Sequence, residues 1–267
     1  MFGVVPKPLW EKTNPADANN RIEMCSRSLL IEDGNRLTLI DTGMGNKQSE
    51  KFFGYYDRWG EDTLENSLAE KGFHKEDITD VFLTHLHFDH CGGAVEKEKN
   101  EVLEPAFKNA VYWSHKDHWQ WATVPNAREK ASFLPENILP LQESGQLKLL
   151  EGKDLILSNT PLGFDIVLVD GHTEKQMLPL IQYKGATLVF AADLIPTAGH
   201  LPIPYIMGYD TRPLLSMKEK TQFLNRAVEE GILLFMEHDP NHELISLQKT
   251  EKGVRMNEKY NLNNYFN

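Results

Sequence analysis

The stretch VFLTHLHFDHCGGA, residues 81–94, holds the densest cluster of potential metal ligands in this chain. An apolar run ends at Thr84, and the next six positions hold three histidines and one aspartate. Rigid scaffolds present their chemistry where strands end. Histidine and aspartate are common ligands of divalent metals. Gly92 and Gly93 follow, and they allow another backbone to approach closely. The stretch therefore predicts a metal site at the end of a buried strand.

The spacing within the stretch indicates more than one ion. His85 and His87 are two positions apart, so their side chains point to the same side of an extended chain. Asp89 and His90 must turn to reach a second position. A lone histidine is more often an ordinary polar residue than a ligand. A cluster of this density directly after an apolar strand favours metal binding.

Length and composition are those of a globular, acidic protein. The chain has 267 residues, of which 40% are hydrophobic and 25% charged, so we expect one packed domain over residues 1–267. The net charge of -11 disfavours nucleic acid as a partner, because phosphate binding needs a clustered Lys/Arg face. We expect a small-molecule substrate; a homo-oligomer is left open.

Two cysteines, Cys25 and Cys91, cannot build a disulfide framework, which favours a reducing compartment. The sequence shows no apolar segment long enough to span a membrane and no features of a signal peptide. We therefore expect a cytoplasmic protein with no membrane partner.

Further candidate ligands follow other predicted strands. The segments FDIVLVDGHT, LVFAADL and ILLFMEH place His172, Asp193 and His238 at or just after the end of an apolar run. In LIDTG, Asp41 likewise ends a predicted strand. Turn signals predict hairpins at residues 33–35 and 184–185. A helix is expected from Pro213 to a stop at Gly231. Strands interleaved with helices predict an α+β fold with two sheets and outer helices.

The candidate ligands are too many for one tetrahedral ion. They suit a pair of divalent ions that share a carboxylate and a water-derived hydroxide. Together the candidates number seven: His85, His87, Asp89, His90, His172, Asp193 and His238. The sequence therefore indicates a dinuclear centre.

The ordered motifs THLHFDHCGG, DGHT, AADL and MEHD resemble those of the metallo-β-lactamase superfamily over nearly the whole chain. The resemblance implies a four-layer αββα sandwich with the site along one edge of the sheets. The resemblance also implies roles for the candidate residues. The first metal would be bound by His85, His87 and His172, and the second by Asp89, His90 and His238. Asp193 would bridge the two metals, and Asp41 would orient a ligand histidine.

A narrower similarity, through MFGVVPKPLWEK, LTHLHFDH and ADLIPT, is to the YtnP-like quorum-quenching lactonases. Proteins of this type carry residues ahead of the first of these stretches, so we expect this chain to lack a first strand or to begin later. Asp193 at the bridging position disfavours β-lactam hydrolysis. His87 disfavours the flavodiiron oxidoreductases, which place glutamate there.

The reaction implied is hydrolysis by a metal-bridging hydroxide, with Asp193 as the bridging ligand and Asp89 passing the proton onward. The favoured substrate is a small lactone of the acyl-homoserine or a related type. Two alternatives stay open: a phosphotriesterase or aryl-ester hydrolase of the methyl parathion hydrolase type, and a non-catalytic metal-binding protein. The expected ions are zinc, with iron, manganese or cobalt also compatible with these ligands.

The substrate pocket is expected in the Pro- and Gly-rich loop after Asp193. Lactonases of this family carry a tyrosine three positions beyond the bridging aspartate, where this chain has Pro196. We select His200 and Tyr205 as candidate substrate-binding residues in this loop. His115 and His118 are expected to cap a helix or to lie on the surface. The aromatic residues could line a pocket for an acyl chain, but such clusters more often belong to the core.

Overall fold

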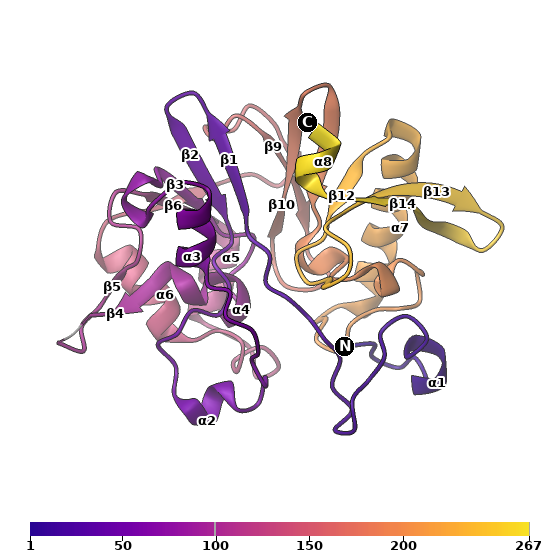
Figure 1. The fold of residues 1–267 in the computed structure, drawn as a ribbon, viewed down its shortest axis with the longest axis horizontal. Helices are drawn as coiled ribbons and strands as arrows, with labels where there is room; N and C mark the ends of the chain where they lie inside the picture. The colour runs from indigo at the N-terminus through magenta and orange to yellow at the C-terminus, as the bar shows by residue number, and fades with distance from the viewer. Residues whose placement is uncertain (99, 267) are drawn as a thin grey trace. The chain divides into compact units, whose positions relative to one another are not determined.

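The computed structural model describes residues 1–98 and 100–266, and the chain forms two compact units. The first unit comprises Ser28–Glu151. The second unit comprises Met1–Arg27 together with Gly152–Asn267. Figure 1 traces both along the chain. That the chain is a single domain stays a prediction.

The first unit is built on a five-stranded sheet in the order β1-β2-β3-β6-β7. β1 and β2 are antiparallel and form the predicted hairpin, whereas the other neighbours are parallel. Figure 1 shows this hairpin beside β3 and β6. A two-stranded ribbon, β4 with β5, completes the strands of this unit. Their bounds are β1 Leu29–Asp33, β2 Arg36–Ile40, β3 Asp80–Phe82, β4 Val95–Lys97, β5 Leu103–Pro105, β6 Val111–His115 and β7 Leu147–Leu150.

Three of the strands joined in parallel in this unit are largely buried. β3 is buried along its whole length, and β2 and β6 are buried except at their first residues. Parallel strands need helices to cover the faces of their sheet. The helices are α2 Glu50–Phe53, α3 Leu64–Glu70, η1 Lys75–Asp77, α4 Phe88–Cys91, η2 Gly92–Ala94, α5 Lys116–Thr123 and α6 Pro135–Glu143.

The second unit is built on a seven-stranded sheet in the order β14-β13-β12-β11-β10-β9-β8. Neighbouring strands are antiparallel except β11 and β12, which are parallel and joined through helix α7, Pro213–Glu230. The strands are β8 Ile156–Leu157, β9 Asp165–Val169, β10 Gln176–Tyr183, β11 Ala186–Phe190, β12 Leu233–Phe235, β13 Leu244–Thr250 and β14 Gly253–Tyr260.

The helices of the second unit follow the predicted signals. α7 spans Pro213–Glu230, and Gly231 caps its C-terminal end with a φ of 67°, which glycine readily adopts. The other helices are α1 Lys7–Trp10, η3 Ala192–Leu194, η4 Ala198–His200 and α8 Leu262–Phe266. No helix in the described part of the chain is both long and apolar enough to cross a membrane.

Lys220 fixes the loop that follows Asp193. It lies on α7, is almost fully buried, and donates to the carbonyl oxygens of His200, Pro202 and Tyr205 at 2.7, 2.9 and 2.9 Å. Burial lowers the pKa of its amine to about 7, and the nearby carboxylate of Asp210 opposes this shift. The three carbonyls match the three donors of an ammonium group. Lys220 therefore holds this loop against the helix.

We predict that Lys220→Met lowers the free energy of unfolding by about 2–4 kcal/mol, because buried carbonyl oxygens lose their donor. Chemical denaturation followed by far-UV circular dichroism measures the change. Lys218→Met is the matched control, since Lys218 is exposed on the same helix and should change stability by less than about 0.5 kcal/mol. Equal losses in the two variants would contradict the role given to Lys220.

Candidate metal centre

The first unit supplies four candidate ligands directly after β3. His85 and His87 lie in the segment before α4, whereas Asp89 and His90 lie within α4, which starts at Phe88. The three histidines are buried and Asp89 is half-buried. The backbone therefore changes from extended chain to helix between the two pairs.

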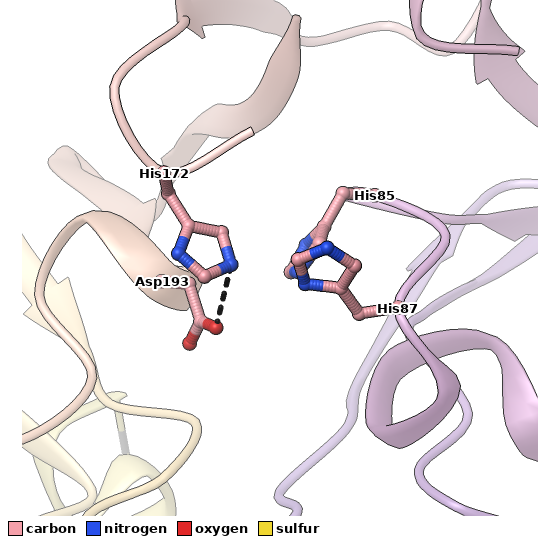
Figure 2. A group of neighbouring side chains, drawn as sticks. All are labelled: His85, His87, His172 and Asp193. Carbon is pink, nitrogen blue, oxygen red and sulfur yellow. Dashed lines mark hydrogen bonds and ion pairs between the residues drawn. The ribbon is translucent and has the colours of Figure 1, made fainter. Parts of the chain in front are cut away.

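His85 and His87 are positioned as a pair. Figure 2 shows their rings close together, and His85 Nε2 lies 3.1 Å from His87 Nδ1. Two nitrogens bound to one tetrahedral zinc, each at about 2.0–2.1 Å from the ion, lie about 3.3 Å apart. The spacing of these two nitrogens therefore fits a shared ion. In the second pair, His90 Nε2 lies 3.9 Å from Asp89 Oδ2.

The two glycines after the motif make room for it. A Cβ atom at Gly92 would collide with the backbone carbonyl of Met44, and one at Gly93 with that of Thr42. The chain after β2 therefore passes directly against the motif, as the glycines predicted. Thr42 also donates its hydroxyl to the His90 carbonyl at 2.9 Å.

Asp41 lies behind the motif and contacts it through three hydrogen bonds. Its Oδ1 accepts from the Thr84 amide at 2.8 Å. Its Oδ2 accepts from the Thr84 hydroxyl at 2.6 Å and faces His90 Nδ1 at 2.9 Å. A carboxylate only accepts, so Nδ1 of His90 carries the hydrogen and Nε2 keeps its lone pair. Asp41 thus sets which nitrogen of His90 can bind a metal.

The second unit supplies three candidate ligands after β9, β11 and β12, and Asp193 stands between the other two. His172 Nε2 lies 3.1 Å from Asp193 Oδ2, a contact drawn in Figure 2, and His238 Nε2 lies 3.1 Å from Asp193 Oδ1. All three side chains are buried. Each carboxylate oxygen therefore faces a different imidazole, which is the arrangement of a carboxylate that bridges two ions.

The distal nitrogens of both histidines are also held. His172 Nδ1 lies 3.0 Å from Asp210 Oδ1, and His238 Nδ1 lies 2.8 Å from the Cys25 carbonyl. Both partners are acceptors, so each Nδ1 carries the hydrogen and each Nε2 turns a lone pair toward Asp193. A lone pair facing a carboxylate requires a cation or a proton between them. The donor set therefore fits divalent metal ions.

His172 carries that proton when no metal is bound. Burial alone would lower its pKa, but the carboxylates of Asp193 and Asp210 outweigh burial and raise the pKa to about 10. A metal ion must displace the proton, so metal affinity should rise with pH up to that value.

The remaining predicted residues, His200 and Tyr205, lie on the loop that follows Asp193. His200 is buried, with Thr197 Oγ1 at 2.8 Å from Nδ1 and Phe2 stacked on its ring at 4.2 Å between centroids. Burial lowers the pKa of His200 to about 3, so it is neutral at physiological pH. Tyr205 is half-buried beside Phe2. Their contact with substrate stays a prediction.

Sequence reasoning missed several supporting residues. Asp210 stands 38 positions from His172, and only its place in the loop expected to form the pocket could have pointed to it. His115 caps α5 with its side chain, as expected. His118 is instead buried, and its Nε2 accepts from the Leu86 amide, between the two ligand histidines, at 2.8 Å.

Comparison with known proteins identifies similar chains. The model of the metallo-beta-lactamase superfamily matches residues 26–244. An N-acyl homoserine lactonase from a Bacillus species is 25% identical over 186 residues, which are 68% of this chain and 64% of that protein. The match therefore spans just under two thirds of that relative's length.

Two solved structures are similar over most of the chain. A probable metal-dependent hydrolase from Staphylococcus aureus has a TM-score of 0.85 and 27% identity, covering 98% of this chain and 92% of its own. AidC, a dizinc quorum-quenching lactonase in complex with a product, has a TM-score of 0.74 and 26% identity, covering 92% and 83%. The predicted α+β class and metallo-β-lactamase fold are confirmed.

We predict that zinc binding to the metal-free protein at pH 7.5 releases at least one proton per chain, because the imidazolium of His172 must lose its proton. Asp210→Asn removes a negative charge that raises this pKa, so the variant should release fewer protons. Titration calorimetry in buffers of different ionisation enthalpy counts them. Equal proton release by both proteins would contradict the role given to Asp210.

Proposed function

We propose that this chain, which belongs to the metallo-beta-lactamase superfamily and is a metal-dependent hydrolase, opens small lactones. The lactones would carry an apolar tail. One observation carries the proposal. The two oxygens of Asp193 face His172 and His238 separately, each at 3.1 Å. A carboxylate so placed suits two ions, which is the centre that a hydrolase of this kind needs.

Each of the two ions would be bound by one pair of ligands from the first unit and by ligands from the second unit. His85 and His87 would bind the first ion together with His172 and one oxygen of Asp193. Asp89 and His90 would bind the second ion together with His238 and the other oxygen. When bound, such a pair of ions supplies a hydroxide nucleophile near neutral pH and polarises the scissile carbonyl.

Protein side chains would handle the protons and the leaving group. Asp89 is the candidate for carrying a proton to the departing alkoxide, because its side chain is 26% exposed whereas that of His90 is buried. Asp193 would link the two sets of ligands, because each of its oxygens would bind a different ion. Pro196 offers no hydroxyl where lactonases of this family have tyrosine, so polarisation of the carbonyl would depend on the metal.

Two observations support an acyl lactone over other esters. The similar proteins at 25% and 26% identity are an N-acyl homoserine lactonase and a quorum-quenching lactonase. The second is an aromatic group beside the ligands: Phe88, between His87 and Asp89 in sequence, packs against Phe52 at 5.2 Å and Tyr56 at 5.0 Å between ring centroids. Such a surface suits an apolar tail.

We predict that the zinc-loaded protein contains about two ions per chain and opens N-acyl homoserine lactones faster than it hydrolyses an aryl phosphotriester. Elemental analysis and parallel assays on the two substrate classes measure this. His90→Ala should keep the fold, by circular dichroism, and lose activity by at least about 100-fold. Faster phosphotriester hydrolysis would favour the alternative of a phosphotriesterase or aryl-ester hydrolase, and a fully active His90→Ala would contradict a catalytic centre.

We predict that Phe52→Ala lowers kcat/KM for a ten-carbon acyl lactone about 5–20-fold and for a four-carbon one less than about 3-fold, because the longer tail loses apolar contact. A chain-length series of lactones measures the ratio. Tyr183→Ala serves as control, since Tyr183 is a half-exposed aromatic residue in the second unit. A uniform loss at all chain lengths would contradict a tail-binding role for this aromatic group.

A further inference from the structure

We infer that Glu129 is a positioning residue that fixes the proton on His87 Nε2, so that His87 offers its other nitrogen, Nδ1, to a metal ion. The inference rests on the proposed metal centre and deepens it. Nothing in the motif around His87 indicates this partner, which lies 42 positions further along the chain, just before α6. The side chains of Glu129 and His87 both lie in the first unit, and their surroundings support this role.

Glu129 is a buried carboxylate directed at His87. Only 2% of its surface is exposed. Its Oε2 accepts from Trp121 Nε1 and from Asn126 Nδ2, both at 2.6 Å. Its Oε1 lies 3.4 Å from His87 Nε2. The two neutral donors satisfy one oxygen, and the imidazole stands at the other.

The loop that carries Glu129 is bonded to the motif. The carbonyl of Glu129 accepts from the amide of Ser132 at 2.7 Å. The carbonyl of Ser132 in turn accepts from the amide of Phe88 at 2.9 Å. Phe133 packs on the His87 ring, with centroids 4.7 Å apart. The carboxylate and the imidazole are therefore held at a fixed separation by backbone as well as side-chain contacts.

Neighbouring groups then set the protons on both members of the histidine pair. Glu129 Oε1 lies 3.4 Å from His87 Nε2, a charge contact longer than an ordinary hydrogen bond, and its negative charge favours a hydrogen on Nε2, which leaves the lone pair on Nδ1. The Thr84 hydroxyl donates to Asp41 and so accepts from His85 Nδ1, which lies 3.1 Å away. His85 Nε2 therefore keeps its lone pair as well.

These two lone pairs face one another, since His85 Nε2 and His87 Nδ1 are 3.1 Å apart. Two acceptors at this distance repel unless a cation binds both. Asp41, through Thr84, sets this state in His85, and Glu129 sets it in His87. Without Glu129, His87 could place its hydrogen on Nδ1 and would then no longer be a ligand.

Glu129→Gln tests this directly. If the glutamine oxygen keeps the bond from Trp121, its amide nitrogen faces His87 Nε2 and favours the wrong tautomer. We expect zinc affinity at the first site, measured by competition with a chromophoric chelator, to fall about 10–100-fold. In long-range ¹H–¹⁵N spectra of the ¹⁵N-histidine-labelled, zinc-loaded protein, the signal of an imidazole bound through Nδ1 should weaken or disappear.

Trp121→Phe is the matched control, because it removes a donor to the other oxygen and leaves Oε1 beside His87. It should change zinc affinity by less than about 3-fold. Unchanged affinity and spectra in Glu129→Gln would overturn the inference, as would an equal loss in Trp121→Phe, which would mark a purely structural loop. A wild-type protein that binds zinc but opens no lactone would refute the proposed substrate and leave the inference about Glu129 intact.

Discussion

The arrangement of the ligand residues depends on one constraint: in three of the ligand histidines, the ring nitrogen turned away from the other ligands meets a hydrogen-bond acceptor. Asp41 faces His90, Asp210 faces His172, and the Cys25 carbonyl faces His238. An acceptor at one nitrogen places the hydrogen there and leaves a lone pair on the other. Since neutral imidazole binds metal through a lone pair, these partners prepare the ligands before any ion arrives.

The fold meets this constraint at the ends of strands. β2 ends at Ile40, and Asp41 follows with a φ of 54°, a left-handed conformation that aspartate tolerates better than most residues. Its three hydrogen bonds to Thr84 and His90 compensate for that conformation. Backbone geometry unfavourable in isolation is thus stabilised by the ligands that it positions.

The sequence predicted the elements well because their signals are local. The hairpin turns, the stop of α7 at Gly231 and the strand before the motif all follow from neighbouring residues. The ligand histidines could be predicted as candidates because they cluster in one motif or follow apolar runs. Asp210 and Glu129 could not, because a buried carboxylate that contacts a distant imidazole leaves no periodic pattern. His118 was misjudged for the same reason, since only the tertiary structure places it against the Leu86 amide.

These distant carboxylates also explain how the proposed ions could be matched in charge. The second ion would bind Asp89 directly and reach Asp41 through His90. The first ion would have no carboxylate ligand of its own besides the shared Asp193, but it would reach Glu129 through His87 and Asp210 through His172. Each divalent ion would therefore face two unshared carboxylates, either directly or through an imidazole. A carboxylate that contacts an imidazole raises the basicity of that imidazole. Glu129 and Asp210 would therefore provide the first ion, through its histidine ligands, with the negative charge that Asp89 provides directly to the second ion.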